Sequence, residues 1–242
     1  MIIINDVHKK FGKKTVLDGL TTNVETGKTT VFIGPSGCGK STILKIILGI
    51  VSSDSGEVLI NDENIFSYSS KKLDQFRSKI GMVFQSAALF DSLSIWENVG
   101  FALLERDGRK REEVREIAIE KLKIVGLGGS EDLYPSELSG GMQKRAAIAR
   151  AIAQNPEIIF YDEPTTGLDP ITSTIIEELM KKLQVETGLT SIIVTHQHST
   201  IFNTADIITM FQKGKAYWSG TVEEIRHEQD PIVKNFIEGK VG

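Results

Sequence analysis

The stretch Gly34-Pro35-Ser36-Gly37-Cys38-Gly39-Lys40-Ser41-Thr42 decides the fold of this chain, because it fits the pattern G-x-x-x-x-G-K-[ST] of a phosphate-binding loop. The five residues before it, Thr29-Thr30-Val31-Phe32-Ile33, are β-branched or aromatic and predict a buried strand. The residues after it, Thr42-Ile43-Leu44-Lys45-Ile46-Ile47-Leu48, continue as an apolar helix. An ordinary glycine-rich turn that contains a lysine is the alternative. The strand and helix on either side favour a nucleotide-phosphate site.

The residue types of this loop suit a nucleotide. Glycines let the backbone fold around an anion, and the helix N-terminus directs N–H groups and a partial positive charge at it. Lys40 would reach the β- and γ-phosphates, and the Ser41 hydroxyl would ligate Mg²⁺. Cys38 invites interpretation as a nucleophile, but no base lies near it in the motif, so a small loop side chain is the better interpretation.

Composition narrows the class of protein. The chain has 242 residues, 40% hydrophobic and 25% charged, which indicates one large α/β domain or a domain with a sizeable insertion. The net charge of −4 gives no electrostatic case for a nucleic-acid partner. No apolar run approaches the roughly 18 residues that span a bilayer. The start lacks the cationic region of a signal peptide, and the single cysteine cannot form an intrachain disulfide. These features predict a cytosolic protein, free or docked on a membrane protein.

The N-terminal part alternates apolar and polar residues. Residues 2–7 and 15–24 predict two strands joined by a turn at 8–14. Phe11 precedes a glycine in this basic turn, so its ring is either a platform for a nucleobase or an edge residue of the hairpin. The spacing leaves both interpretations open.

Polar residues follow several of the predicted core strands. Gln85 ends the strand 80–84, and His196 ends the strand 191–195. The carboxyl end of a core strand in an α/β protein faces the ligand crevice. A lone histidine is more often structural, but this position favours a contact with the γ-phosphate.

Two adjacent carboxylates end another buried strand, residues 158–161. Asp162 suits Mg²⁺, and Glu163 suits orienting or deprotonating an attacking water. Two surface acids are the alternative, and the continuously apolar strand before them argues against it. Residues 166–170 then form a turn into a helix over 171–187.

A second helix start with anion-binding character lies at Leu138-Ser139-Gly140-Gly141-Met142, before a helical pattern that runs through Ala153. Ser139 is a suitable N-cap, and the paired glycines expose helix N–H groups. A simple capped helix remains the alternative.

Residues 86–155 predict a mainly helical insertion into the α/β core, with helices over 94–104 and 110–125. Its first stretch, 86–93, is apolar without a clear period. Leu89 and Phe90 there belong either to the core or to a protein interface. The remaining predicted elements are a strand at 58–60, a helix at 71–79, a strand at 207–211, a strand ending at Trp218, a helix from Thr221 and an amphipathic end at 232–237.

Together, and in this order, the motifs resemble the ATP-binding cassette of an ABC transporter over nearly the whole chain. Gly34–Thr42 matches the Walker A loop, Ile158–Asp162 the Walker B strand and Glu163 the catalytic glutamate. The resemblance also assigns the base-stacking aromatic to Phe11, the Q-loop glutamine to Gln85, the D-loop aspartate to Asp169 and the switch histidine to His196. Leu138–Met142 resembles the signature LSGGQ, with Met142 in place of the final glutamine.

This resemblance implies a P-loop NTPase (RecA-like) core with an N-terminal antiparallel β subdomain and an inserted α-helical subdomain. It implies one domain over 1–242, with the helical subdomain at 86–155 and a helical tail at 221–242. ATP is the implied substrate, held by Gly34, Pro35, Ser36, Gly37, Cys38, Gly39, Lys40, Ser41 and Thr42, with Mg²⁺ on Ser41, Gln85 and Asp162. Ser139, Gly140 and Gly141 would cap ATP held by a second copy, which implies a homodimer.

A finer resemblance is to the ATPases of Mla/Mce-type lipid transporters. It rests on residues 84–93, on the methionine of LSGGM and on residues 230–236. It implies lipid transport across the envelope of Gram-negative bacteria or plastids. It also implies an MlaE-like permease, MCE-domain lipid-binding subunits and a position on the cytoplasmic face of the inner membrane.

Three other functions stand as alternatives. A cassette for a small solute, such as an amino acid or a metal complex, belongs to the same broad class. A soluble ABC ATPase of DNA repair or translation usually carries tandem cassettes or a long coiled coil, and this chain has one cassette and no sustained heptads. A nucleotide-binding regulator without turnover is disfavoured by the intact Lys40, Asp162, Glu163 and His196.

Overall fold

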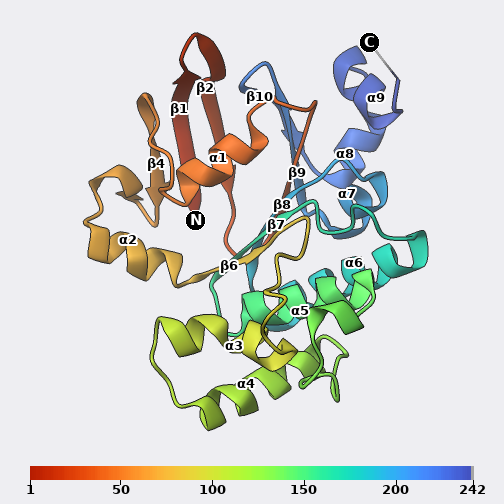
Figure 1. Ribbon diagram of the computed structural model, residues 1–242. Helices are drawn as coiled ribbons and strands as arrows, with labels where there is room; N and C mark the ends of the chain where they lie inside the picture. The colour runs from red at the N-terminus through yellow and green to blue at the C-terminus, as the bar shows by residue number, and fades with distance from the viewer. Residues whose placement is uncertain (241–242) are drawn as a thin grey trace. The chain divides into compact units, whose positions relative to one another are not determined.

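The computed structural model describes residues 1–240, which belong to two compact units (Figure 1). The first unit comprises residues 1–77 and the chain from residue 190 onward, and the second comprises residues 78–189. Among the described residues, no helix is both long and apolar enough to cross a membrane.

The N-terminal part of the first unit is an antiparallel sheet with strand order β2-β1-β4-β5. Its strands are β1 (Ile2–Phe11), β2 (Lys14–Val24), β4 (Ser55–Ile60) and β5 (Glu63–Asn64). The predicted turn at 8–14 is too long, because β1 continues through the polar run to Phe11 and only two residues separate it from β2. Register shifts in the β1–β2 ladder accommodate this run.

The other strands of the first unit pair around β3 (Thr29–Ile33). This strand is parallel to β8 (Thr190–Val194) and to β9 (Ile207–Gln212), and β10 (Lys215–Gly220) is antiparallel to β9. Every residue of β3 and β8 is buried, as expected for parallel strands covered on both faces. The rings of Phe32 and Phe211 lie 4.9 Å apart between centroids.

In the part of the first unit that the structure describes, the helices are α1 (Lys40–Ile47), α2 (Ser70–Arg77), α7 (His198–Thr204), α8 (Val222–His227) and α9 (Pro231–Ile237). A 3₁₀ turn covers Ile65–Ser67. Thr221 caps α8 in a capping box, and Asp230 caps α9. Helix α7 was not predicted from the sequence. Residues 241–242 of the predicted tail lie outside the described residues.

The second unit contains a parallel pair of strands and a group of helices. β6 (Ile80–Val83) pairs with β7 (Ile158–Asp162), and Val83 lies opposite Tyr161. The helices are α3 (Ile95–Glu105), α4 (Arg111–Ile124), α5 (Gly140–Ile152) and α6 (Pro170–Thr187), with a 3₁₀ turn at Pro135–Glu137. Helices α3, α4 and α5 contact one another, and α5 also contacts β6 and α6 (Figure 1). The combination of parallel and antiparallel strands with helices confirms the predicted α/β P-loop fold class.

The close approach of β4 to β1 depends on Gly56, which gives a testable prediction. Its φ is +82°, and a Cβ there would lie 2.2 Å from the carbonyl oxygen of Asp6. We expect Gly56→Ala to lower the free energy of unfolding by about 2–4 kcal/mol, because left-handed strain adds to a backbone clash. Urea denaturation followed by circular dichroism measures this loss.

Gly12→Ala is the matched control in the same unit. Its φ is +58° and a Cβ there would meet nothing within 4 Å, so this variant carries only the left-handed strain of about 1 kcal/mol. Equal losses in the two variants would show that the contact with Asp6 is not limiting.

Candidate functional site

The loop between β3 and α1 depends on a glycine. Gly34 has φ +136°, and a Cβ there would lie 2.3 Å from the carbonyl oxygen of Phe211 on β9. Any side chain would therefore push the loop away from β9. Helix α1 begins after Gly39, and neither a side-chain cap nor an acidic residue occupies its first turn. Its first N–H groups are therefore available to an anion.

The Lys40 ammonium lies within this loop. It donates to the carbonyl oxygens of Gly34 at 2.7 Å and Pro35 at 3.0 Å, and it lies 3.6 Å from Cys38 Sγ. Cys38 is only 8% exposed, which agrees with a small side chain packed beneath the loop. The residues that face solvent are Pro35, Ser36, Gly37 and Ser41. The loop thus combines a fixed cation with an accessible hydroxyl.

His196 follows β8, and the phosphate loop follows β3 at the same edge of the sheet. Phe32 pairs with Val194 in the parallel ladder, so Gly34 and His196 each come two residues after a paired position. His196 is exposed. The parallel pairing therefore places both at one carboxyl edge of the first unit.

Phe11 lies at the end of the β1–β2 hairpin in the same unit. Its ring is 51% exposed, and the Lys9 ammonium lies 5.4 Å from the ring centroid. This exposure is compatible with stacking on a flat ligand.

The second unit brings Gln85 and Glu163 together. Gln85 follows β6 and Glu163 follows β7, and the Lys144 ammonium donates to the carbonyl oxygens of Gln85 at 2.5 Å and Glu163 at 3.4 Å. Asp162 is the last residue of β7. Glu163 has φ +49°, and the Thr166 hydroxyl donates to its Oε2 at 3.0 Å. The carboxylate is therefore oriented by a neighbour in its own loop.

Ser139 caps α5 as predicted, since its Oγ accepts a hydrogen bond from the Met142 N–H at 3.3 Å. Ser139 and Gly140 are exposed. A Cβ on Gly141 would lie 2.4 Å from Thr172 Cγ2, so this glycine lets α5 approach the start of α6.

Asp169 caps α6 beside this contact. Its carboxylate accepts hydrogen bonds from the Thr172 hydroxyl at 2.5 Å and from the Thr172 N–H at 3.0 Å. These two bonds hold the pKa of Asp169 below its usual value, the hydroxyl having the larger effect. Thr172 therefore links Asp169 to Gly141 within the second unit.

Two residues of α5 that were not predicted as functional hold the segment after Gln85 and the loops beside it. One is Lys144, and the other is Arg150, whose guanidinium donates to the carbonyl oxygens of Ala87 at 2.7 Å and Ala88 at 2.5 Å. Both alanines have positive φ, 61° and 50°. The sequence feature that could have pointed to these two residues is the presence of a lysine and an arginine in a helix rich in small apolar residues.

Asn98 of α3 binds the backbone of the residues that follow, from Phe90 to Ser94. It is fully buried, and its side-chain amide accepts from the Phe90 N–H and donates to the carbonyl oxygens of Phe90, Leu93 and Ser94. The Phe90 ring remains 44% exposed and packs on Phe101 with centroids 4.5 Å apart. Phe90 is therefore not a core residue, which leaves the protein-interface interpretation for this stretch.

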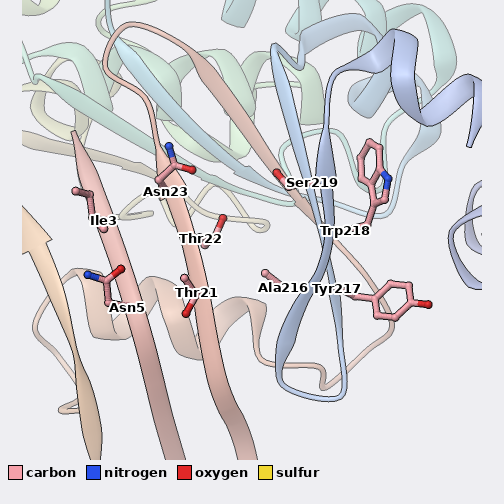
Figure 2. A pocket seen from close by; sticks show the side chains of 9 residues that line it. All are labelled: Ile3, Asn5, Thr21, Thr22, Asn23, Ala216, Tyr217, Trp218 and Ser219. Atoms are coloured by element: carbon pink, nitrogen blue, oxygen red, sulfur yellow. The ribbon is translucent and has the colours of Figure 1, made fainter.

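A groove of about 390 Å³ lies in the first unit between the β1–β2 ribbon and β10 (Figure 2). Tyr217 and Trp218 point away from β1 and β2, and they donate to Asp230 at 2.8 Å and Glu228 at 2.7 Å. The groove is lined by Ile3, Asn5, Thr21, Thr22, Asn23, Ala216, Tyr217, Trp218 and Ser219. None of these belongs to the predicted nucleotide site.

Within residues 1–240, no three histidine, cysteine or acidic side chains group closely enough to hold a metal ion. The predicted Mg²⁺ ligands Ser41, Gln85 and Asp162 are a hydroxyl, an amide and a carboxylate. Such oxygen donors fit Mg²⁺, which proteins commonly hold by one or two carboxylates together with substrate phosphates.

The fold and these motifs define a P-loop nucleotide-binding cassette. Residues 17–166 match the family described as ABC transporter, and the chain belongs to this family.

Three relatives indicate which members it resembles. One is Protein TRIGALACTOSYLDIACYLGLYCEROL 3, chloroplastic, of Arabidopsis thaliana, which is 42% identical over 100% of this chain and 74% of its own length. Another is the intermembrane phospholipid transport system ATP-binding protein MlaF of Haemophilus influenzae, 40% identical over 99% of this chain and 91% of its own length. A solved dimeric, post-hydrolysis structure of an ATP-binding cassette bound to ADP and Pi has a TM-score of 0.81. It is 36% identical and covers 92% of this chain and 99% of its own.

The single cysteine of the chain tests the phosphate loop. We expect N-ethylmaleimide to label Cys38 slowly, because the thiol is buried, and we expect labelling to abolish ATP binding, because the adduct would deform the loop. Saturating MgATP should slow the labelling further. Mass spectrometry and fluorescent nucleotide binding measure the two effects, with Cys38→Ala as the unlabelled control. Equal labelling rates with and without nucleotide would place Cys38 outside the binding site.

Proposed function

We propose that this chain is the ATP-binding and ATP-hydrolysing subunit of an ABC transporter that drives phospholipid or related lipid transport across a bacterial cell envelope. The observation that carries the lipid assignment is the near full-length similarity to the ATP-binding protein of an intermembrane phospholipid transport system. The similarity to the Arabidopsis protein points to the same group of transporters. A cassette for a small solute is not favoured.

In this proposal the first unit holds the nucleotide. The residues from Gly34 to Thr42 surround the phosphates, and the Lys40 ammonium exchanges its carbonyl contacts for β- and γ-phosphate oxygens. Phe11 stacks on the adenine, and His196 contacts the γ-phosphate. The exposed Phe11 ring and the common edge of Gly34 and His196 support these roles.

Hydrolysis depends on the residues that follow β6 and β7. Glu163 orients or deprotonates the attacking water, and Gln85 senses the γ-phosphate. Ser41, Gln85 and Asp162 would hold Mg²⁺, which neutralises charge on the phosphates. The fixed position of the Glu163 carboxylate, bonded to Thr166, supports this role.

A second copy of the chain completes each site. Ser139, Gly140 and Gly141 cap ATP held by the partner, and Asp169 lies at the same interface. The link from Gly141 through Thr172 to Asp169 supports a common surface. The likeness to a dimeric cassette with ADP and Pi supports a homodimer.

The proposed transporter also includes an MlaE-like permease and MCE-domain lipid-binding subunits. The chain would lie on the cytoplasmic face of the inner membrane, with the permease docked at the exposed Phe90. The whole chain would act as one ABC ATPase domain, with residues 86–155 as its helical subdomain and the chain from residue 221 as its tail.

Glu163→Gln tests turnover. We expect this variant to bind MgATP and to lose at least about 99% of hydrolysis, because an amide cannot activate water. It should also accumulate as a dimer with MgATP, since the bound nucleotide persists at the interface. Phosphate release and light scattering measure the two effects.

Lys40→Ala is the contrasting variant, because it should weaken ATP binding itself. Near-normal turnover by Glu163→Gln in the assembled transporter would refute the role given to Glu163. A monomer at saturating MgATP would refute the dimer.

Phe90→Ala tests permease docking. The ring is already 44% exposed, so we expect a loss of stability of only about 1–2 kcal/mol, less than for a buried phenylalanine. Co-purification with the membrane permease should fall several-fold, while ATP binding stays unchanged.

Val185→Ala is the matched control, because it removes another exposed apolar side chain, 69% exposed, from the same unit. Full retention of the permease by Phe90→Ala, or a melt lowered by the amount typical of a core cavity, would contradict the docking role.

A further inference from the structure

Lys144 is a buried cation in the second unit. The residue is 5% exposed and is the fifth residue of α5, the helix that begins after Ser139. Its ammonium has three donors and bonds the carbonyl oxygens of Gln85 and Glu163. One side chain thus joins the start of α5 to the loops that follow β6 and β7.

The position is electrostatically unfavourable for a lysine. Burial lowers the pKa of Lys144, and the charges of Glu163 and Asp162 act in the opposite direction. The residue also lies near the N-terminal end of α5, where the helix dipole disfavours a cation. Replacing a buried charge by an apolar side chain of similar size is often neutral for stability or favourable. Fold stability alone therefore does not explain Lys144.

The contact acts on a strained residue. The backbone of Glu163 adopts the left-handed conformation, which costs roughly 1–2 kcal/mol for a residue with a side chain. The carbonyl oxygen of Glu163 accepts from the Lys144 ammonium and from the Thr166 N–H, each at 3.4 Å, and its carboxylate accepts from the Thr166 hydroxyl. Thr166 therefore holds Glu163 from within its own loop, and Lys144 holds its backbone from α5.

Arg150, further along α5, binds the segment that follows Gln85. It bonds the carbonyl oxygens of Ala87 and Ala88, while Lys144 bonds that of Gln85. A shift of α5 along its axis would therefore pull on the segment 85–88 and on Glu163 together.

We propose that Lys144 is a positioning residue for ATP hydrolysis, which transmits the placement of the α5 N-terminus to Gln85 and Glu163. When Ser139 and the following glycines seat against nucleotide, α5 is fixed, and Lys144 fixes the backbone of both loops. The inference rests on the proposed function and adds to it a residue that acts through its hydrogen bonds to Gln85 and Glu163.

The test measures kcat and KM for ATP in steady-state hydrolysis by the assembled transporter that contains this chain. Lys144→Met keeps the length and burial of the side chain but removes the donors. We expect kcat to fall about tenfold or more, because small displacements of reacting groups carry such costs, and KM to change less than about threefold. Lys144→Arg keeps a cation with several donors and should retain at least about a third of kcat.

Two further variants keep the result interpretable. Lys121→Met is the control, because Lys121 is a poorly exposed lysine of the same unit whose ammonium bonds Asn155 instead, and its kcat should be unchanged. If Lys144→Met does not fold, Lys144→Gln decides by the same criteria, because its shorter amide cannot span both carbonyl groups.

The outcomes separate this inference from the proposed function. A kcat within about twofold of wild type in a folded Met or Gln variant overturns it, and so does an equal loss in the Met and Arg variants. A purely structural role would lower thermal stability without a selective loss of kcat, and that result also overturns it. If the wild-type chain itself does not hydrolyse ATP in its transporter, the proposed function fails instead. In the Glu163→Gln background, Lys144→Met should leave the MgATP-dependent dimer intact.

Discussion

The parallel pairing of β3 is the constraint on which the first unit depends. All five residues of β3 are buried between β8 and β9, so the strand cannot shift register without exposing apolar surface. This pairing sets the edge from which the phosphate loop and His196 emerge. The second unit uses the same geometry on a smaller scale, because the pairing of β6 with β7 places Gln85 beside Glu163. In each unit a lysine ammonium binds carbonyl groups that follow the strands. Lys40 binds that of Gly34 in the first unit, and Lys144 binds those of Gln85 and Glu163 in the second.

The loop after β3 and the loops after β6 and β7 tolerate unusual backbone in different ways. In the loop after β3, Gly34 permits positive φ and close contact with β9, where a side chain would clash. In the second unit Ala87, Ala88 and Glu163 adopt positive φ although each has a Cβ. Arg150 and Lys144 bind the carbonyl groups of these residues, so hydrogen bonds from α5 offset the strain. A loop held by donors from another helix responds to movement of that helix.

The local sequence pattern was sufficient to predict most of the helices and strands. The strands at β3, β7 and β8 are short apolar runs with clear ends, and the predicted boundaries agree within about one residue. Helix α7 was missed because its sequence, His198–Thr204, is short and mostly polar. It is stabilised by burial of Thr200, Ile201 and Thr204, which the sequence does not reveal. The roles of Lys144 and Arg150 were missed for a related reason, since their partners lie 19 to 63 residues away. Such contacts depend on tertiary packing, whereas the phosphate loop is encoded in nine consecutive residues.

Met142 shows why a departure from the family signature is compatible with an intact helix start. The hydrogen bond that caps α5 runs from the backbone N–H of Met142 to Ser139 Oγ, so it does not depend on the side chain at position 142. The side-chain amide of Gln143, the next residue, donates to the carbonyl oxygen of Pro135 at 2.9 Å and to that of Leu138 at 3.4 Å. This amide ties the preceding turn to α5, which fixes the position of Ser139. The polar attachment of the segment therefore lies at Gln143, and position 142 is free to carry an apolar side chain.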